Sequence, residues 1–292
     1  MAEARDVGVP QLEKLLEPLP EHATLVYVND PGVEPEPFLY QAVHRRLEAG
    51  GVAVLALTSR SPAAALKAMR DLGLDVQPHR ERLVFLDAFS AMMGTMSDAK
   101  YAAMSPGNVE EFATLLERAA RDQPAALLAI DSLSQLADQS SWERLAAGVP
   151  RILQAMRRFD VAAAGFTRWP YSGDVDGLLS AFDAVVSLRG VEERVMLSQY
   201  FRVERATWKD PLDAKPRLYK SLKPGGVHVY IPKIVVTGPY NAGKSSFVHS
   251  VSDQAVSVDQ LGTTVALDHG RVTLDGLAAD LFGTPGQSRF DP

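Results

Sequence analysis

The chain has 292 residues, of which 46% are hydrophobic and 23% charged, and its formal net charge is −6. This composition is ordinary for a globular protein and allows one large or two medium domains, and the negative charge argues against a dominant nucleic-acid-binding surface. Because there is no cysteine, a disulfide framework, thiolate metal sites and cysteine nucleophiles are excluded.

Helical and strand patterns alternate through the first part of the chain. A leucine stripe predicts a short N-terminal helix at 8–17. The expected strands are 24–28, 52–57, 83–86, 126–130 and 161–166, and the expected helices are 38–48, 63–72, 109–121 and 142–159. Because the strands are continuous apolar runs separated by helices, we expect an α/β fold with a parallel sheet covered on both faces.

The pattern becomes strand-rich from about residue 184 and starts again at Lys233. The expected strands are 184–188, 195–205, 218–221 and 227–231. After Lys233, the expected elements are a strand at 234–237, a helix at 245–251, and strands near 265–267, 272–274 and 277–282. This restart predicts two domains, 1–231 and 232–292.

The segment GPYNAGKS at 238–245 carries the strongest functional signal. It fits G-x-x-x-x-G-K-[ST] between a predicted strand and a predicted helix, a context that disfavours a chance glycine–lysine loop. In such a loop the N–H groups turn toward a phosphate, Lys244 supplies charge to the β- and γ-phosphates, and the Ser245 hydroxyl can bind Mg²⁺. The expected phosphate-binding residues are Gly238, Asn241, Ala242, Gly243, Lys244, Ser245 and Ser246.

Two further features follow the loop: Thr263 with Thr264, and the sequence GTPGQ at 283–287. Each alone would be an ordinary loop segment. Together with the loop they resemble the Ras-like GTPases, most closely the prokaryotic small GTPases whose third motif reads F-G-T-P-G-Q-x-R-F.

This resemblance implies GTP or GDP with Mg²⁺ as cofactors, and GTP hydrolysis if the domain is completed beyond residue 292. Thr264 would be the switch I threonine that closes on Mg²⁺ and the γ-phosphate, with Thr263 as the alternative. Gly286 would offer its N–H to the γ-phosphate, and Gln287 would orient the attacking water.

Three features depart from that family. Gly283 stands where Ras has an aspartate that contacts magnesium through water, and Tyr240 stands where a glycine is frequent beside the γ-phosphate. The sequence ends at Pro292, inside the third motif, so the guanine-reading element N/T-K-x-D is absent and we expect a fragment of a longer protein. An ATP-using P-loop enzyme therefore stays as an alternative.

Residues 24–231 resemble the RecA/KaiC-like ATPases in the order and spacing of their elements. The stretch NDPGVEPE at 29–36 takes the place of that family's G-P-P-G-x-G-K-T. Pro35 stands at the lysine position, and the carboxylates of Glu34 and Glu36 would face a triphosphate with no cation beside them, which is repulsive. The resemblance therefore implies a degenerate domain that does not hydrolyse nucleotide.

Two more motifs of that family can be located. The strand end LTSRSP at 57–62 lacks the family's catalytic carboxylate. Asp131 keeps the aspartate at the end of the apolar strand LLAID. We favour a structural role for Asp131, capping a turn through Ser132 and Ser134, over a metal-binding role.

The leading hypothesis is a GTP-binding regulatory switch fused to a non-hydrolysing RecA-like domain that acts in assembly or signalling. Self-association or a protein partner is expected through the RecA-like domain, and a non-enzymatic scaffold is the further alternative. For the basic stretch 202–223 we favour a solvated hairpin face over the alternative of a subunit or partner interface, although Trp208 points to a contact.

The sequence gives no sign of a membrane partner. The first ten residues do not contain a basic region followed by an apolar stretch, so they do not read as a signal peptide. The apolar runs at 52–57 and 125–130 are far shorter than the ~20 residues of a membrane span. Together with the absence of cysteine, these features predict a cytoplasmic protein.

Overall fold

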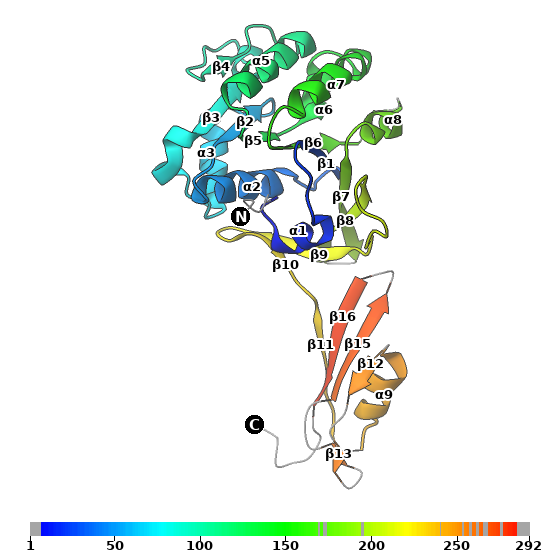
Figure 1. Ribbon diagram of the computed structural model, residues 1–292. Helices are drawn as coiled ribbons and strands as arrows, with labels where there is room; N and C mark the ends of the chain where they lie inside the picture. Colours follow the sequence, from blue (N-terminus) through cyan, green and yellow to red (C-terminus); the bar gives the residue numbers. More distant parts are fainter. Residues whose placement is uncertain are drawn as a thin grey trace. The chain divides into compact units, whose positions relative to one another are not determined.

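The computed structural model describes residues 7–168, 170–171, 174–193, 196–239, 241–252, 254–256, 259–260, 263–264, 268–274 and 277–284. The chain divides into two compact units (Figure 1). The first comprises Met1–Ala214 and Tyr219–His228, and the second Lys215–Leu218 and Val229–Pro292. They are called the N-terminal unit and the C-terminal unit below.

The N-terminal unit is built on one sheet of ten strands in the order β10-β9-β8-β7-β1-β6-β5-β2-β3-β4. From β7 to β4 neighbouring strands run parallel, whereas β8 pairs with β7 in the antiparallel direction. The strands are β1 (Ala23–Asn29), β2 (Ala53–Leu57), β3 (Leu83–Asp87), β4 (Tyr101–Ala102), β5 (Leu127–Ile130), β6 (Val161–Thr167), β7 (Ala184–Glu193), β8 (Met196–Ala206), β9 (Arg217–Leu222) and β10 (Gly226–Val229). This sheet confirms the predicted α/β class.

Helices cover both faces of this sheet. They are α1 (Pro10–Leu16), α2 (Glu36–Glu48), α3 (Pro62–Asp71), the 3₁₀ helix η1 (Gln77–Arg82), α4 (Phe89–Met92), α5 (Val109–Asp122), α6 (Leu133–Gln139), α7 (Trp142–Met156) and α8 (Val175–Ser180). Successive strand residues point to opposite faces, and β1 shows the result: Val28 lies in one core cluster with α5 to α8, whereas Tyr27 contacts Phe38 of α2, with ring centroids 5.4 Å apart. Burial on both faces explains why these strands are continuously apolar.

Gln41 of α2 joins the start of the chain to strand β10. Its side-chain Nε2 donates a hydrogen bond of 2.7 Å to the Gly8 carbonyl, and its Oε1 accepts the N–H of Val227 at 2.8 Å. Gly8 has a φ of +90°, and a Cβ added there would lie 2.4 Å from the nitrogen of Ala42. Only glycine therefore allows the N-terminal segment to lie this close to α2.

We expect Gln41→Leu to lower the free energy of unfolding by about 1–3 kcal/mol, because it leaves the buried N–H of Val227 without its acceptor. Urea unfolding followed by tryptophan fluorescence measures this change, since all three tryptophans belong to the N-terminal unit. Gln11→Leu, at an exposed position of α1, is the matched control. Equal stability of the two variants would contradict the bridging role of Gln41.

The C-terminal unit contains a four-stranded sheet in the order β11-β16-β15-β12. Strand β11 (Lys233–Val236) pairs parallel with β16 (Leu277–Gly283), which pairs antiparallel with β15 (Asp268–Leu274), and β15 pairs antiparallel with β12 (Gln254–Val256). Helix α9 (Lys244–Val251) packs on this sheet through the buried side chain of Val248. The strand predicted near 265–267 lies outside the described residues, and the one at 272–274 is part of β15.

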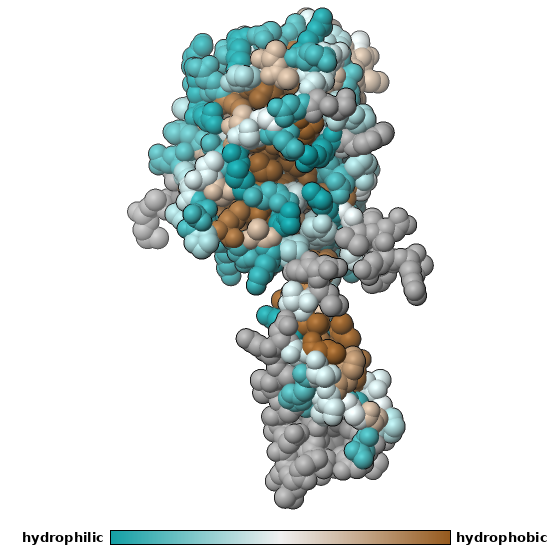
Figure 2. Space-filling model, turned by 90° about the vertical axis from the view of Figure 1, so that its right-hand side faces the viewer, coloured by the Kyte–Doolittle hydropathy of each residue, from teal (hydrophilic) through white to brown (hydrophobic). Residues whose placement is uncertain are grey.

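Apolar side chains are exposed on the C-terminal unit, whose surface Figure 2 shows in part. Ile234 and Val235 of β11 are 44% and 61% exposed, and Phe247 of α9 is 50% exposed. Within the described part of the sheet, β11 is an edge strand that pairs only with β16. An apolar edge of this kind can accept a further strand.

Across the residues that the structure describes, no helix has the length and apolar character needed to cross a membrane.

Candidate functional site

The loop at 238–245 connects the end of β11 to the start of α9, so the strand–loop–helix context of the motif is present. Gly243 precedes α9 with a φ of +77°, and Asn241 has a φ of +60°. No atom lies within 4 Å of a Cβ added at Gly243. The glycine is therefore required for its backbone angle, which turns the loop into the helix, rather than for space.

Lys244 folds back over this loop. Its Nζ donates hydrogen bonds of 2.8 Å to the carbonyl oxygens of Gly238 and Pro239. The loop thus surrounds its own ammonium group next to the N-terminus of α9. A phosphate fits this arrangement because the ammonium group and the helix N-terminus both favour negative charge.

The beginning of the GTPGQ motif lies at the same sheet edge as the loop. Gly283, the last residue of β16, is in register with Val236, the last residue of β11. The N–H of Thr284 donates to the Val236 carbonyl at 3.0 Å, and its Oγ1 lies 3.3 Å from the same oxygen. The sequence pattern did not single out Thr284 as an anchor, although it lies two residues after the predicted strand 277–282.

The other residues expected at the nucleotide either belong to a separate sheet or lie outside the described residues. Thr264 belongs to β14 (Thr263–Thr264), which pairs with β13 (Asp259–Gln260) in a separate two-stranded sheet. Tyr240, Gly286 and Gln287 lie outside the described residues. Their roles stay predictions.

Strand β15 places a carboxylate beside Gly283. A Cβ added at Gly283 would lie 3.0 Å from Oδ2 and 3.2 Å from Cβ of Asp268, and 3.4 Å from Cγ2 of Val248. Asp268 is only 1% exposed. An aspartate at position 283 would therefore meet the Asp268 carboxylate, which gives a physical reason for the departure from Ras at this position. A cation, a hydroxyl and a buried carboxylate belong to this unit, and this donor set suits a phosphate with Mg²⁺.

The N-terminal unit holds a different arrangement at 29–36, where β1 leads into α2. Pro35, at the position of the family's lysine, precedes α2 and packs against β6. A Cβ added at Gly165 of β6 would lie 2.9 Å from Cγ of Pro35 and 2.5 Å from the Asp131 carbonyl oxygen. This segment is therefore packed against the sheet, and Pro35 offers no hydrogen-bond donor to a phosphate.

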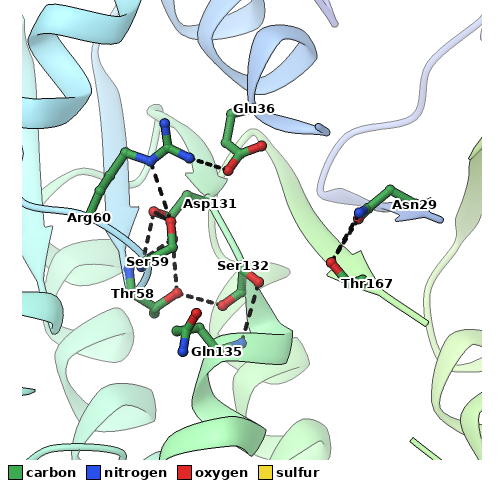
Figure 3. Close-up of polar contacts among 9 residues, drawn as sticks. All are labelled: Asn29, Glu36, Thr58, Ser59, Arg60, Asp131, Ser132, Gln135 and Thr167. Atoms are coloured by element: carbon green, nitrogen blue, oxygen red, sulfur yellow. Dashed lines mark hydrogen bonds and ion pairs between the residues drawn. The ribbon is translucent and has the colours of Figure 1, made fainter. Parts of the chain in front are cut away.

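Glu36 forms an ion pair with Arg60, so the expectation that no cation lies beside its carboxylate is wrong (Figure 3). The guanidinium also lies 6.0 Å from the ring centroid of Tyr40, and Nε lies 3.5 Å from Oγ of Ser59. Burial raises the pKa of Glu36, and Arg60 offsets part of this effect. Among the described residues, the second carboxylate oxygen of Glu36 has no hydrogen-bond partner.

Asp131 is fully buried, and Thr58 and Ser59 donate hydrogen bonds to its carboxylate. One oxygen accepts the N–H and Oγ1 of Thr58 at 2.8 and 2.9 Å, and the other accepts the N–H and Oγ of Ser59 at 3.2 and 2.6 Å. Burial raises the pKa of Asp131, and these hydrogen bonds oppose that rise. The role is structural, but the expected partners differ: Ser132 caps α6, and Ser134 accepts the N–H of Thr167.

The stability contribution of Glu36 should depend on pH. Because the folded-state pKa is raised, the contribution is largest below the ordinary value of 4.5 and is lost as the pH rises through the folded-state pKa. We expect the free energy of unfolding of the wild type minus that of Glu36→Gln to fall over this range, by about 1.4 kcal/mol for each unit of pKa shift. Urea unfolding at pH 4.5 and at a series of higher pH values measures it, with exposed Glu34→Gln as control. If the wild type instead gains stability relative to Glu36→Gln as the pH rises, the prediction is wrong.

Residues of the basic stretch 202–223 donate hydrogen bonds to backbone carbonyls elsewhere in the chain. Trp208 donates its indole N–H to the Leu16 carbonyl at 2.8 Å, and Nζ of Lys209 donates to the Glu17 carbonyl at 2.9 Å. Both contacts lie at the C-terminal end of α1, where carbonyl groups need donors. Arg205 likewise donates to backbone carbonyls, at 2.7 Å for Ser180. The contact expected for Trp208 is therefore made to α1.

Comparisons with known proteins agree with a P-loop at 238–245 and with the fold of the N-terminal unit. Residues 233–291 match the family described as 50S ribosome-binding GTPase. An uncharacterized protein of Methanocaldococcus jannaschii is 37% identical over 59 residues, which are 20% of this chain and 38% of that protein. UPF0273 proteins of Pyrococcus horikoshii and Thermotoga maritima are 27% and 26% identical over 133 residues, 44% of this chain and 54% and 55% of those proteins. The chain thus spans about half or less of the length of these curated relatives.

A solved KaiC-like protein of Pyrococcus horikoshii shares the fold with a TM-score of 0.61 and 17% identity, covering 77% of this chain and 97% of that one. The chain therefore combines a KaiC-like RecA fold with a segment that matches a P-loop GTPase family model, as the two resemblances predicted. P-loop NTPase-like domains of this kind support a nucleotide-binding module.

Proposed function

We propose that the chain is a regulatory switch in which residues 232–292 bind GTP or GDP with Mg²⁺, and residues 1–231 form a RecA-like domain that does not hydrolyse nucleotide. The observation that carries this proposal is the loop at 238–245, with Lys244 enclosed in it and Thr284 anchored at the same sheet edge. Coupling between the switch and the RecA-like domain would serve assembly or signalling in the cytoplasm, through self-association or a protein partner.

Each residue of the loop has a distinct task in this proposal. The N–H groups of Asn241 to Ser246 surround the phosphates, Lys244 leaves its two carbonyl acceptors to bind the β- and γ-phosphates, and Ser245 holds the metal. When bound, Mg²⁺ offsets the negative charge of these phosphates. Gly286 donates its N–H to the γ-phosphate, Gln287 orients the water, and Thr264 closes on the metal side.

The side chains at 29–36 support the proposal that the N-terminal unit does not hydrolyse nucleotide. A triphosphate at this loop would meet the carboxylates of Glu34 and Glu36, and the nearby Arg60 is already paired with Glu36. The Asp131 carboxylate accepts four hydrogen bonds and so has no oxygen left for a metal ion. Among the described residues at this end of the sheet, Arg60 and Asp131 are thus engaged by protein groups rather than available to a nucleotide or Mg²⁺.

The proposal is tested by titrating the chain with fluorescently labelled GTP in the presence of Mg²⁺ and displacing it with GTP or ATP. Displacement by GTP at much lower concentration than by ATP is the expected result. Stronger displacement by ATP would indicate an ATP-using enzyme, and the absence of binding would indicate a scaffold. The size of the particle in solution with a GTP analogue and with GDP tests the coupling, and equal sizes would contradict it.

A further inference from the structure

We propose that Asp268 supplies the carboxylate on the magnesium side of the C-terminal nucleotide site, a role that residue 283 cannot fill. This inference rests on the proposed function of the same unit and adds a residue to it. Asp268 lies outside the loop and the two switch motifs, so the sequence pattern did not single it out.

The strand register brings Asp268 to the correct sheet edge. Asp268, the first residue of β15, pairs with Gly283, the last residue of β16, and Gly283 pairs with Val236 at the end of β11. The loop at 238–245 begins two residues after Val236. Asp268, Gly283 and Val236 therefore lie in one row across three strands, and this row ends two residues before the phosphate-binding loop.

The packing places the carboxylate in the space next to Gly283. Oδ2 of Asp268 lies 3.0 Å from the position of a Cβ at residue 283, and Val248 of α9 closes the same space from the helix side at 3.4 Å. The Asp268 carboxylate and Val248 of α9, the helix that begins with Lys244 and Ser245, thus border the same space beside Gly283. A glycine at 283 is the residue that leaves room for this carboxylate.

The chemistry of the site requires such a group. P-loop NTPases hold Mg²⁺ with the loop serine or threonine together with an aspartate from a nearby strand, and Mg²⁺ keeps several waters through which a carboxylate can act. Asp280, three residues before Gly283, carries the other carboxylate described on these strands, and it accepts a 2.9 Å hydrogen bond from Arg271.

The test measures metal binding in the nucleotide complex rather than turnover. Mn²⁺ is titrated into the full chain with GDP and followed by electron paramagnetic resonance, and labelled GDP binding is measured with and without the metal. Asp268→Asn should lower the Mn²⁺ affinity by about 10–100-fold, the usual cost of removing a group that orients metal ligands, while metal-free binding of GDP stays as in the wild type. Asp280→Asn is the matched control and should keep the wild-type Mn²⁺ affinity.

A transposed variant separates the metal role from a packing role. Asp268→Gly combined with Gly283→Asp moves the carboxylate to the paired strand position and fills the space that Asp268 leaves. The double variant should recover the Mn²⁺ affinity that Asp268→Gly alone loses. A folded double variant without recovery, or an Asp268→Asn variant that keeps its Mn²⁺ affinity, would overturn the inference.

Two other outcomes are decisive. If Asp268→Asn weakens GDP binding equally with and without Mn²⁺ and lowers the melting temperature, Asp268 only supports the fold and the inference is wrong. If the wild-type chain binds GDP in neither condition, the proposed function fails, and the inference fails with it. Tight, metal-dependent GDP binding by the wild type together with an indifferent Asp268→Asn variant refutes the inference alone.

Discussion

Replacement of Lys244 by alanine is expected to remove most of the nucleotide affinity of the C-terminal unit. Loss of one partner from a desolvated charge pair costs about 2–5 kcal/mol, which corresponds to a ~30-fold to ~4,000-fold weaker Kd. In this loop Lys244 is the residue whose ammonium group the backbone already encloses, through the Gly238 and Pro239 carbonyls. Titration with labelled GTP measures the change.

The controls for this prediction address charge and folding. Lys233→Ala removes a lysine of β11, whose Nζ lies 5.9 Å from the ring centroid of Phe282, and it should leave the affinity for GTP close to that of the wild type. Lys244→Arg keeps the charge but changes its geometry, and it should bind more weakly than the wild type. Wild-type affinity in Lys244→Ala would show that nucleotide, if bound, lies elsewhere.

The arrangement of the N-terminal unit could be predicted because its strands carry an unambiguous pattern. Strand β1 is buried along its whole length, and such apolar runs separated by helices occur in parallel sheets with two covered faces. The capping residues of short helices were less informative. Ser132 caps the N-terminus of α6 and Ser141 that of α7. Only seven residues form α6, so the 3.6-residue period was too brief to separate it from a loop.

The loop at 238–245 could be predicted because its function depends on a local pattern, glycine spacing followed by lysine and serine. The other contacts depend on residues distant in sequence. Arg60 reaches Glu36 across 24 positions, and Trp208 reaches Leu16 across 192. No spacing rule connects such residues, because only the order of strands in the sheet brings them together. The same limit applies to Asp268, whose position beside Gly283 follows from strand register.

The ion pair between Arg60 and Glu36 joins the turn after β2 to the start of α2. A helix N-terminus such as that of α2 favours negative charge, and in this chain the carboxylate of Glu36 occupies it. Arg60, from the turn after β2, supplies the opposite charge, while Asp131 holds the same turn through Thr58 and Ser59. Glu36 and Arg60 therefore supply the negative and the positive charge at this end of the central strands.

Arg60→Met is therefore expected to destabilise the N-terminal unit strongly. Breaking a buried ion pair costs about 3–5 kcal/mol because the remaining charge stays buried, and we expect about 3 kcal/mol, the lower end of this range, since 29% of the Arg60 side chain is exposed. Urea unfolding followed by tryptophan fluorescence measures it. Arg70→Met, at an exposed position of α3, is the control and should change stability by less than about 0.5 kcal/mol.

Two companion measurements decide whether the ion pair is the cause. The deficit of Arg60→Met should become smaller as the pH is lowered toward 4.5, because Glu36, whose pKa is raised by burial, then takes up a proton and no longer needs the guanidinium. Glu36→Leu combined with Arg60→Met should recover much of the loss, since apolar residues can replace a buried ion pair. If the double variant is less stable than Arg60→Met at every pH, packing by the two side chains, rather than their charges, stabilises this end of the sheet.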